Sequence, residues 1–327
     1  MPRLTFSADI DGKMRAAVTT LLPQMAVPAL RGAIHVTLLA GGANNINLVL
    51  RGRGHVWTLK LRDPLCTSFG VDPRAAIECQ RAAAALGVAP DIVACALPAG
   101  HFMSEFIDGT TLRPALIRAQ GVAPLIIDTL RRLHTARDAV RSFWIFDDLR
   151  TFMQGAQKHA AQCSAELLEL HAMAMRMEPI FRAIPAPQAL CHNDLVPQNM
   201  LLAAGRVKLV DFDYAGSGWI AVDLAGASSQ AEMTPQETEA FLAAYDPGLD
   251  EAQRARVEAV HFLNALREAA WATYAEPVLA QKTALLQGWS YEAHRRMNLE
   301  LARGILGRRS LAQLAADATY VRPGARF

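Results

Sequence analysis

The hydrophobic pattern of this 327-residue chain changes its period near Asp108–Gly109. Before that point, apolar and polar residues alternate, which is the two-residue period of a half-buried β-strand. After it, apolar residues recur every three to four positions, as in an amphipathic helix. A chain of this length is also too long for one hydrophobic core of ordinary size. We therefore expect an α+β chain with two lobes: a small antiparallel β-sheet lobe over residues 1–108, and a larger, mainly helical lobe over residues 109–327.

The first lobe is predicted to hold a five-stranded sheet and one inserted helix. Alternation marks the strands at residues 33–40, 46–50, 55–62, 92–96 and 102–107. The helix follows Asp72, which suits an N-cap, begins at Pro73 and ends before Gly87. A hinge between the lobes is expected at Ser104–Gly109.

The second lobe shows helical spacing over Val122–His134, Leu149–Leu170 and Val257–Tyr274. Thr234-Pro235-Gln236-Glu237 fits a capping box that opens a further helix. One short β-rich segment, from Ala189 to Asp211, interrupts the helical pattern.

Charge and cysteine usage restrict the partners and the compartment. The 33 Lys+Arg oppose 31 Asp+Glu, so neither nucleic acid nor an anionic membrane is expected as the main partner. The longest uncharged stretch, Gly32–Leu50, holds a histidine and three asparagines and is a poor membrane span. The five cysteines form no Cys-x-x-Cys pair and are typical of thiols in a reducing compartment. Because Asp9 and Asp11 stand where a signal peptide needs its apolar core, we expect a soluble, cytoplasmic protein. A monomer or a homodimer is expected.

The β-rich segment carries three oxygen-bearing side chains at strand ends: Asp194, Asn199 and Asp211. Phosphoryl transfer offers a protein little covalent work, so catalysis consists of positioning and of charge neutralisation by Mg²⁺. One carboxylate and one amide suffice for Mg²⁺ beside phosphate and water oxygens, and a second carboxylate must face the incoming hydroxyl. Alone, a His-x-Asp triplet with a later Asn is more often a capped surface turn. The apolar flanks and the Asp-Phe-Asp at hairpin distance favour a functional site instead.

The motif His-x-Asp-x-x-x-x-Asn, followed by a strand that ends in Asp-Phe-Asp, resembles the catalytic region of the aminoglycoside phosphotransferase and choline/ethanolamine kinase superfamily. The fold of that superfamily is related to the protein kinases, so the resemblance implies a bilobal, protein-kinase-like fold. It also implies that Asp194 is the catalytic base, that Asn199 and Asp211 hold magnesium, and that His192 supports the loop. For Asp213 it implies an orienting role or a second metal.

Two further segments are similar to the choline kinase branch. Val210–Gly216, with Asp223-Leu224-Ala225 downstream, resembles its acidic-aromatic signature, although Gly226 stands where that branch often has Asn. The run from Gly41 to Asn47 resembles its Gly-Gly-x-Thr-Asn-x-Asn phosphate loop, with Asn44 in place of Thr. Backbone amides beside two glycines can approach a phosphate closely. The expected ATP-phosphate loop therefore comprises the residues Gly41, Gly42, Asn44 and Asn45.

The resemblance also implies a cation on the third strand, paired with a glutamate of the following helix. Alternation places Lys60 and Arg62 together on one face of that strand. Lys60 is the favoured nucleotide contact and Arg62 the alternative, with Glu78 as the expected partner. Alternatively, Lys60 could be a solvated charge on an edge strand and Glu78 could face water. Adenine is expected at main-chain groups of the hinge, the carbonyl of Glu105 and the amide of Ile107.

The acceptor must be argued from the helical lobe. An aminoglycoside polycation needs a pocket rich in carboxylates, whereas choline needs aromatic rings. From Glu251 to Phe327, seven acidic residues face eleven Lys+Arg, which argues against a polycation. Aromatic residues are concentrated after the metal-binding strand, although any one of them could be helix-packing core. The candidate acceptor-binding residues are Tyr214, Trp219, Trp271, Tyr274, Trp289 and Tyr291.

We therefore expect an ATP- and Mg²⁺-dependent phosphotransferase that acts on the hydroxyl of a small amino alcohol, choline or ethanolamine above all. An aminoglycoside or other small-molecule O-phosphotransferase is the first alternative. A catalytically inactive kinase-like binding module is the second, against which the joint presence of Asp194, Asn199 and Asp211 argues. A protein kinase is disfavoured, because its strand end would read Asp-Phe-Gly and because the path from Asp211 to Asp223 is short.

Overall fold

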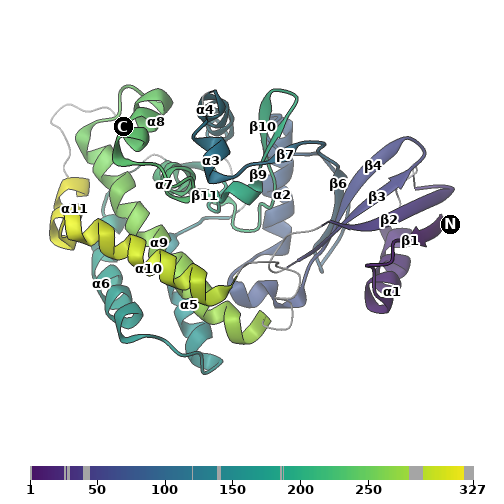
Figure 1. Ribbon diagram of the computed structural model, residues 1–327, viewed down its shortest axis with the longest axis horizontal. Coiled ribbons are helices and arrows are strands. Elements are labelled where there is room, and N and C mark those ends of the chain that lie inside the picture. Colours follow the sequence, from purple (N-terminus) through teal and green to yellow (C-terminus); the bar gives the residue numbers. More distant parts are fainter. Residues whose placement is uncertain are drawn as a thin grey trace.

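The computed structural model describes residues 2–25, 27, 30–39, 45–119, 121–137, 141–184, 186, 188–279 and 290–319. A β-sheet forms one end of the molecule and a group of helices forms the other (Figure 1). Gly41, Gly42 and Asn44 of the expected phosphate loop lie outside the described residues, as does Trp289 of the expected acceptor set.

The sheet at the N-terminal end has six strands in the order β1-β2-β3-β4-β6-β5. These are β1 (Arg3–Phe6), β2 (Ala33–Leu39), β3 (Ile46–Gly52), β4 (His55–Leu61), β5 (Ile92–Ala96) and β6 (His101–Glu105). Five of them are the predicted strands, and they pair antiparallel. The sixth, β1, pairs in parallel with β2, so the prediction of a five-stranded, wholly antiparallel sheet is wrong at this edge.

One face of this sheet is covered by α1 (Gly12–Leu21) and the short 3₁₀ helix η1 (Leu22–Met25). Trp57, Leu59 and Leu61 of β4 point together into the hydrophobic cluster under these helices, as their alternation predicts. The opposite side of β4 carries Lys60 and Arg62, both of which are buried.

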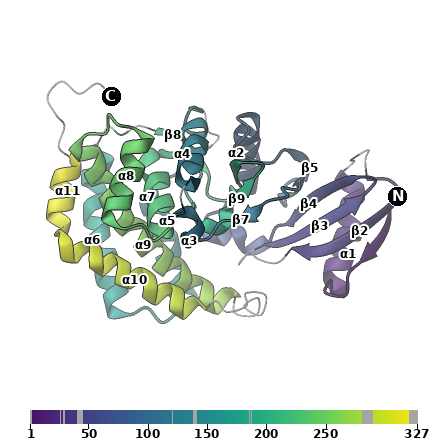
Figure 2. The same ribbon diagram turned by 45° about the horizontal axis from the view of Figure 1, so that its top comes forward.

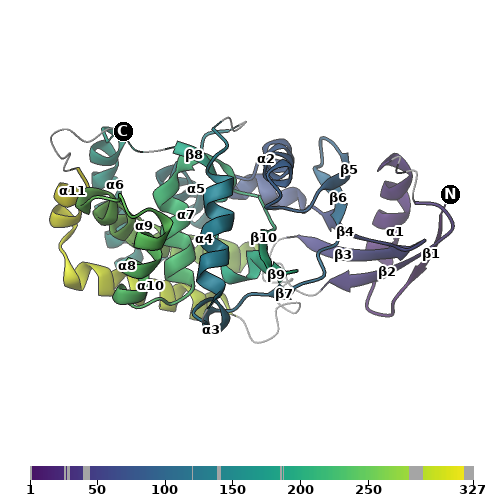
Figure 3. The ribbon, with the colours of Figure 1, turned by 90° about the horizontal axis from the view of Figure 1, so that it is seen from above.

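Between the sheet and the helices lie η2 (Pro64–Phe69) and α2 (Pro73–Ala85). The predicted N-cap is confirmed, because the Asp72 side chain accepts hydrogen bonds from the amides of Arg74 and Ala75. Phe69 and Cys79 from these elements are buried in the core of the helical part rather than in that of the sheet. Figure 3 shows α2, with the strands β9 and β10, between the sheet and the helices.

The helical part is built around α9 (Glu251–Leu279), which packs against α5, α7, α10 and α11 (Figure 2). The other helices are α3 (Pro114–Ile117), α4 (Val122–Leu133), α5 (Ile145–Lys158), α6 (Ala165–Arg182), α7 (Ile220–Gln230), α8 (Pro235–Tyr245), α10 (Tyr291–Arg308) and α11 (Leu311–Thr319). The capping box of α8 is confirmed, since Thr234 and Glu237 bond to each other's backbone amides.

The predicted helix Leu149–Leu170 is wrong as a single element. After α5 the chain turns at Ala160, whose φ is +52°. Ser164 then caps α6, and its side chain accepts a hydrogen bond from the Leu167 amide. A local N-cap thus overrides an apolar pattern that runs through both helices.

Two small sheets stand at the junction. One has the order β10-β9-β7 and the other pairs β11 with β8. Their strands are β7 (Thr110–Thr111), β8 (Gln188–Cys191), β9 (Met200–Ala203), β10 (Arg206–Leu209) and β11 (Gly216–Trp219), and the 3₁₀ helix η3 (Pro197–Asn199) precedes β9. The predicted lobe boundary at residue 108 falls between β6 and β7 and stays a prediction. Within the described ranges, no helix has the length and apolar character needed to span a membrane.

Candidate active site

The loop after β8 is held by a buried carboxylate. Asp223, on α7, accepts hydrogen bonds from the backbone amides of His192 (2.8 Å) and Asn193 (2.7 Å). Asn193 has a φ of +62°, a conformation that residues other than glycine rarely adopt. The two bonds to Asp223 therefore fix a strained turn immediately before Asp194.

His192 links this loop to the strand end that precedes Asp211. Its Nε2 lies 2.9 Å from the carbonyl oxygen of Val210, so this nitrogen donates and the ring is the neutral Nε2–H tautomer. Burial lowers the pKa of His192, in agreement with a neutral ring. The ring packs at 4.7 Å on Phe212. These contacts favour the predicted supporting role for His192 over a role in proton transfer.

A second layer of polar groups lies behind Asp223. The Nε2 of His134 is 3.0 Å from Asp223 Oδ2, and its Nδ1 is 2.8 Å from the Tyr245 hydroxyl. Sequence reasoning missed His134 and Tyr245, because each lies on a helix far along the chain from the loop. Their contacts with Asp223 orient the carboxylate that holds the loop.

Asp194 lies between an amide and a guanidinium. The Nδ2 of Asn199 donates to the Asp194 carbonyl oxygen (2.9 Å) and to its Oδ2 (3.3 Å). On the other side, Arg267 Nη1 is 3.6 Å from Asp194 Oδ1. Burial raises the pKa of Asp194 to about 7, with Arg267 opposing the rise and Glu268 adding to it. Such a carboxyl group can take up or release a proton near neutral pH.

Lys60 joins the sheet to the two aspartates of the Asp-Phe-Asp motif. Its Nζ is 2.6 Å from Asp211 Oδ1 and 2.7 Å from Asp213 Oδ1. The predicted pairing of Lys60 with Glu78 is therefore wrong in this structure. Glu78 pairs instead with Arg74, one turn earlier on α2, at 2.9 Å. The reason is that α2 turns Glu78 toward solvent, while the hairpin brings two carboxylates directly to β4.

Both carboxylate oxygens of Asp213 have partners from this chain. Lys60 and Arg62 both pair with its Oδ1, Arg62 at 2.9 Å, and Asn45 donates to its Oδ2 at 3.0 Å. Burial alone would raise the pKa of Asp213, but Lys60 and Arg62 together hold it well below its usual range. Because Asp213 contacts three side chains and Asp211 only Lys60 among the described residues, Asp213 fits the predicted orienting role better than a metal-binding one.

Asn199 and Asp211 fit a magnesium ion. The amide nitrogen of Asn199 is used toward Asp194, which leaves its oxygen as a possible ligand. Only Oδ1 of Asp211 has a protein donor among the described residues, and its side chain is about one third exposed. Asp211 also has a φ of +65°, a strained conformation of the kind found at functional sites. Oxygen ligands of this type are those that Mg²⁺ prefers, although their metal roles stay predictions.

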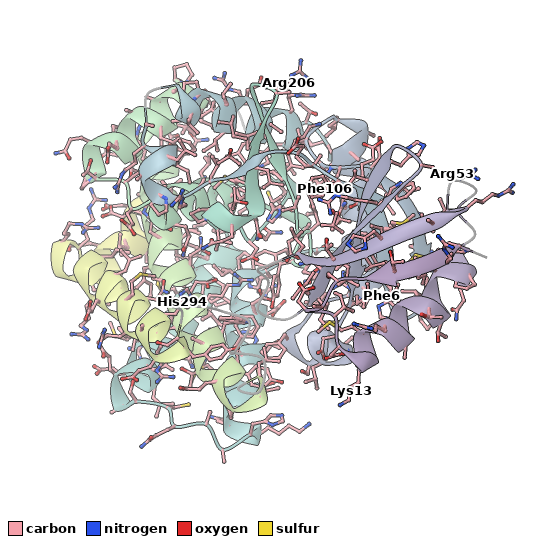
Figure 4. The ribbon with its side chains drawn as sticks, turned by 45° about the vertical axis from the view of Figure 1, so that its right-hand side comes forward. Phe6, Lys13, Arg53, Phe106, Arg206 and His294 are labelled. Carbon is pink, nitrogen blue, oxygen red and sulfur yellow. The ribbon has the colours of Figure 1, made fainter. Side chains whose placement is uncertain are left out.

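The expected adenine-binding segment lies where the six-stranded sheet ends. Glu105 closes β6, and its amide donates to the Asp91 carbonyl oxygen at 3.0 Å. The amide of Phe106 donates to the Val56 carbonyl oxygen at 3.2 Å, and Ile107 is the next residue along the chain. Figure 4 shows Phe106 at the junction between the sheet and the helical part. The contacts of Glu105 and Ile107 with a nucleotide stay predictions.

The structure brings only part of the expected aromatic set near Asp194. The ring of Tyr214 lies 4.5 Å from the guanidinium carbon of Arg267. Trp219 is buried against Trp144 and Phe181 in the helix packing.

Two more of the expected aromatic residues, Tyr274 and Trp271, lie on α9. Tyr274 is also buried and stacks on Phe69 at 4.3 Å. Trp271 packs against Tyr291 at 5.8 Å and against His294 at 6.0 Å.

A narrow pocket adjoins Asp194 between α7 and α9. The water-sized space between its walls is about 10 Å³, which is room for about one water molecule, and the pocket is open to solvent on one side. Together with residues 193–196 and Val222, its walls are formed by Gly226, Gln230, Asn264, Arg267 and Glu268. Of these residues, the sequence analysis singled out only Asp194 and, as a departure from the family pattern, Gly226.

Arg267 is the main residue of this site that sequence reasoning missed. It is buried, and its Nε pairs with Asp148 Oδ2 at 2.8 Å while its Nη1 lies 3.1 Å from Glu268 Oε1. Asp148 and Arg267 are 119 positions apart, so no local motif could reveal the pair. A buried arginine needs such partners, because an unpaired buried charge is very costly.

Most of the chain is similar to known proteins. A family model described as "Phosphotransferase enzyme family" matches residues 35–259. The curated protein LicA of Haemophilus influenzae is 25% identical over 210 residues, which cover 63% of this chain and 61% of that protein. The chain thus spans about three fifths of the length of this curated relative.

Solved structures show the same fold. The choline kinase LicA of Streptococcus pneumoniae superposes with a TM-score of 0.71 at 20% identity, covering 92% of this chain and 100% of that chain. A choline/ethanolamine kinase family protein of Mesorhizobium loti gives a TM-score of 0.70 at 20% identity, covering 94% and 98%. At such identities the likeness concerns the fold alone, and the predicted kinase-like α+β fold is confirmed.

Proposed function

This chain belongs to the phosphotransferase enzyme family, and on that premise we propose that it moves the terminal phosphoryl group of ATP to the hydroxyl of a small amino alcohol. The observation that carries the proposal is the position of Asp194. Its carboxylate contacts Asn199, one of the two proposed magnesium ligands, and also lines the pocket between α7 and α9. A hydroxyl in that pocket would meet a carboxylate beside the place where a phosphate is expected.

Each residue of the site has a definite task in this reaction. Asn199 and Asp211 would hold Mg²⁺, which when bound neutralises charge on the phosphate oxygens and aligns them. Lys60 is anchored by Asp211 and Asp213, and it supplies a cation near the end of β4 for the nucleotide phosphates. Asp194 orients the acceptor hydroxyl and takes its proton as the new P–O bond forms. Arg267 and Asn199 keep the Asp194 carboxylate in one position.

The class of acceptor is supported by the charge of the pocket and by the relatives. Asp194 and Glu268 both line the pocket, and Arg267 between them is already paired with Asp148. The pocket therefore favours a cation. LicA of Streptococcus pneumoniae is described as a choline kinase, which supports an amino alcohol.

The proposal is tested by an acceptor screen that follows ADP release from MgATP. Choline, ethanolamine and kanamycin are compared at equal concentration, and a reaction without acceptor gives the background. ADP release that depends on an amino alcohol, and that is lost in Asp211→Ala, would support the proposal. Release with kanamycin alone would assign the chain to aminoglycosides. Binding of MgATP without release in any reaction would favour an inactive binding module.

A further inference from the structure

The pocket beside Asp194 is lined by hydrogen-bond acceptors. The Nδ2 of Asn264 is directed at the Val222 carbonyl oxygen, 3.4 Å away, which leaves the amide oxygen of Asn264 available. Glu268 has one partner on each oxygen, Arg267 on Oε1 and His294 on Oε2 at 3.0 Å. A carboxylate has about four lone-pair sites, so about two remain for a ligand. The pocket thus suits a ligand that carries N–H donors.

Among the described residues, the aromatic face of Tyr214 is already covered by a cation of this chain. A quaternary ammonium ion has no N–H group and is held by the faces of aromatic rings. Tyr214 shares its cationic neighbour Arg267 with Asp194, and the guanidinium of Arg267 lies over the Tyr214 ring at 4.5 Å. Arg267 is itself fixed by Asp148 and Glu268. A ligand could reach the Tyr214 face only by displacing a buried, paired cation.

The part of the pocket that the structure describes has no aromatic side chain among its lining residues. Trp271, one turn after Glu268, turns its ring to His294 and Tyr291. Figure 4 shows His294 on α10, and its Nε2 contacts Glu268 on α9 from that side.

We infer that the acceptor carries a protonated primary or secondary amine, as ethanolamine does, and that Glu268 and Asn264 bind its N–H groups. Gln230 of α7 also lines the pocket and carries an amide oxygen. This inference rests on the proposed function, because it specifies the acceptor of the same site. It predicts that choline, with its methylated ammonium, is the poorer substrate.

The test is a series of acceptors that have the same hydroxyl group and the same two-carbon spacer and that differ in the number of methyl groups on the nitrogen. These are ethanolamine, N-methylethanolamine, N,N-dimethylethanolamine and choline, with 3,3-dimethylbutanol as the uncharged analogue of choline. We expect kcat/KM to fall at least about tenfold from ethanolamine to choline, since a site built for N–H donors rejects analogues that lack them. The fall should lie mainly in KM, and 3,3-dimethylbutanol, which also lacks the charge that the pocket favours, should be poorer still.

A variant pair assigns the preference to Glu268. Glu268→Gln should reduce the ratio of ethanolamine to choline kcat/KM by about tenfold, because the amide keeps the shape but replaces one acceptor oxygen, which ethanolamine needs and choline does not, by an NH₂ donor. Glu258→Gln is the matched control on the same helix. Glu258 pairs with Arg309 at 3.3 Å, away from the pocket, so its variant should keep the wild-type ratio. Thermal unfolding of both variants checks that they fold.

The outcomes separate this inference from the proposed function. Choline used as well as ethanolamine, or better, would overturn the inference and leave the kinase assignment standing. An unchanged ratio in Glu268→Gln would overturn the role of Glu268. Absence of transfer to every amine in the series would overturn the inference together with the proposed function.

Discussion

Asp194 has the surroundings expected of a group that handles one proton per turnover. Asn199 and Arg267 hold its two oxygens, and burial brings its pKa to about 7. We predict that Asp194→Asn lowers kcat by about 10²–10⁴, since the amide cannot accept the hydroxyl proton. The affinity for MgATP should stay within about threefold of wild type, because Asp194 is not a proposed nucleotide contact. Steady-state kinetics and calorimetric nucleotide titration measure the two effects, and a near-normal kcat would refute the assigned role.

The sequence predicts the residues of this site that belong to one local motif. His192, Asp194, Asn199 and Asp211 follow from a spacing within one hairpin, and the structure brings them together. Arg267 could not be predicted, because its partner Asp148 is supplied by a different helix. The same holds for the contact of His134 with Asp223, because the two residues are 89 positions apart, although Asp223 itself belongs to the signature that the sequence shows. Long-range pairs of this kind depend on the packing of helices, which no local pattern encodes.

At the scale of elements, alternation and capping signals predict the central strands and most helix starts. The edge strand β1 escaped prediction, because four residues with a partly exposed pattern give too little alternation to recognise. The break between α5 and α6 was hidden for the opposite reason: apolar spacing continues across it. Ser164 was the available signal, since serine is a favourable N-cap.

Gly226 offers a prediction about α7. It lies inside this helix and lines the acceptor pocket. A methyl group added there would meet Leu195 Cβ at 3.5 Å and Asn264 Nδ2 at 3.8 Å, which are ordinary contacts. Because glycine costs a helix about 1 kcal/mol relative to alanine, Gly226→Ala should raise the melting temperature by about 2 °C. The same methyl group narrows the pocket, so the acceptor KM should rise several-fold.

Gly304→Ala on α10 is the control for that experiment. Its added methyl group meets no atom within 4 Å, and the position is exposed and distant from the pocket-lining residues. This variant should gain similar stability and keep the wild-type KM. A lower melting temperature for Gly226→Ala, or an unchanged KM, would contradict the placement of Gly226 in the acceptor wall.

Glu178 makes the packing of α6 on α5 dependent on pH. Hydrogen bonds from Arg150, together with those from Arg182 and Trp144, lower the pKa of Glu178 to about 2 although burial opposes them. In the unfolded chain the pKa returns to about 4.5, so this carboxylate stabilises the fold fully above pH 4.5 and loses its effect as the pH falls toward 2. Glu178→Gln should therefore be less stable than wild type at pH 7, and the gap should shrink between pH 4.5 and 2.

Urea unfolding at pH 7 and at pH 3 measures this gap. Glu239→Gln serves as the comparison, because Glu239 makes an exposed pair with Arg254, and exposed pairs contribute little. A gap for Glu178→Gln that is equal at both pH values would show that the ionised carboxylate is not the stabilising form.

At the scale of the whole molecule, the ion cluster of Lys60, Arg62, Asn45 and Asp213 ties the sheet to the strands that carry the site. The sheet has its own hydrophobic cluster, separate from the larger core of the helical part. Polar contacts therefore fix the position of the sheet relative to the helical part at the place where ATP is expected to bind. A nucleotide bridging them would add binding energy to the folded state alone, which raises stability by mass action.

We predict that MgATP raises the melting temperature of the wild type, with a stabilisation of about 2.7 kcal/mol at one hundred times its dissociation constant. Lys60→Met should lose most of this rise, because Lys60 is the cation that also contacts Asp211, beside the proposed metal. Arg62→Met should lower the melting temperature without ligand, since Arg62 is buried on Asp213, yet keep most of the MgATP-dependent rise. Differential scanning fluorimetry with and without MgATP compares the three proteins. If Arg62→Met alone lost the rise, the nucleotide-contacting cation would be Arg62, two residues along the same face of β4.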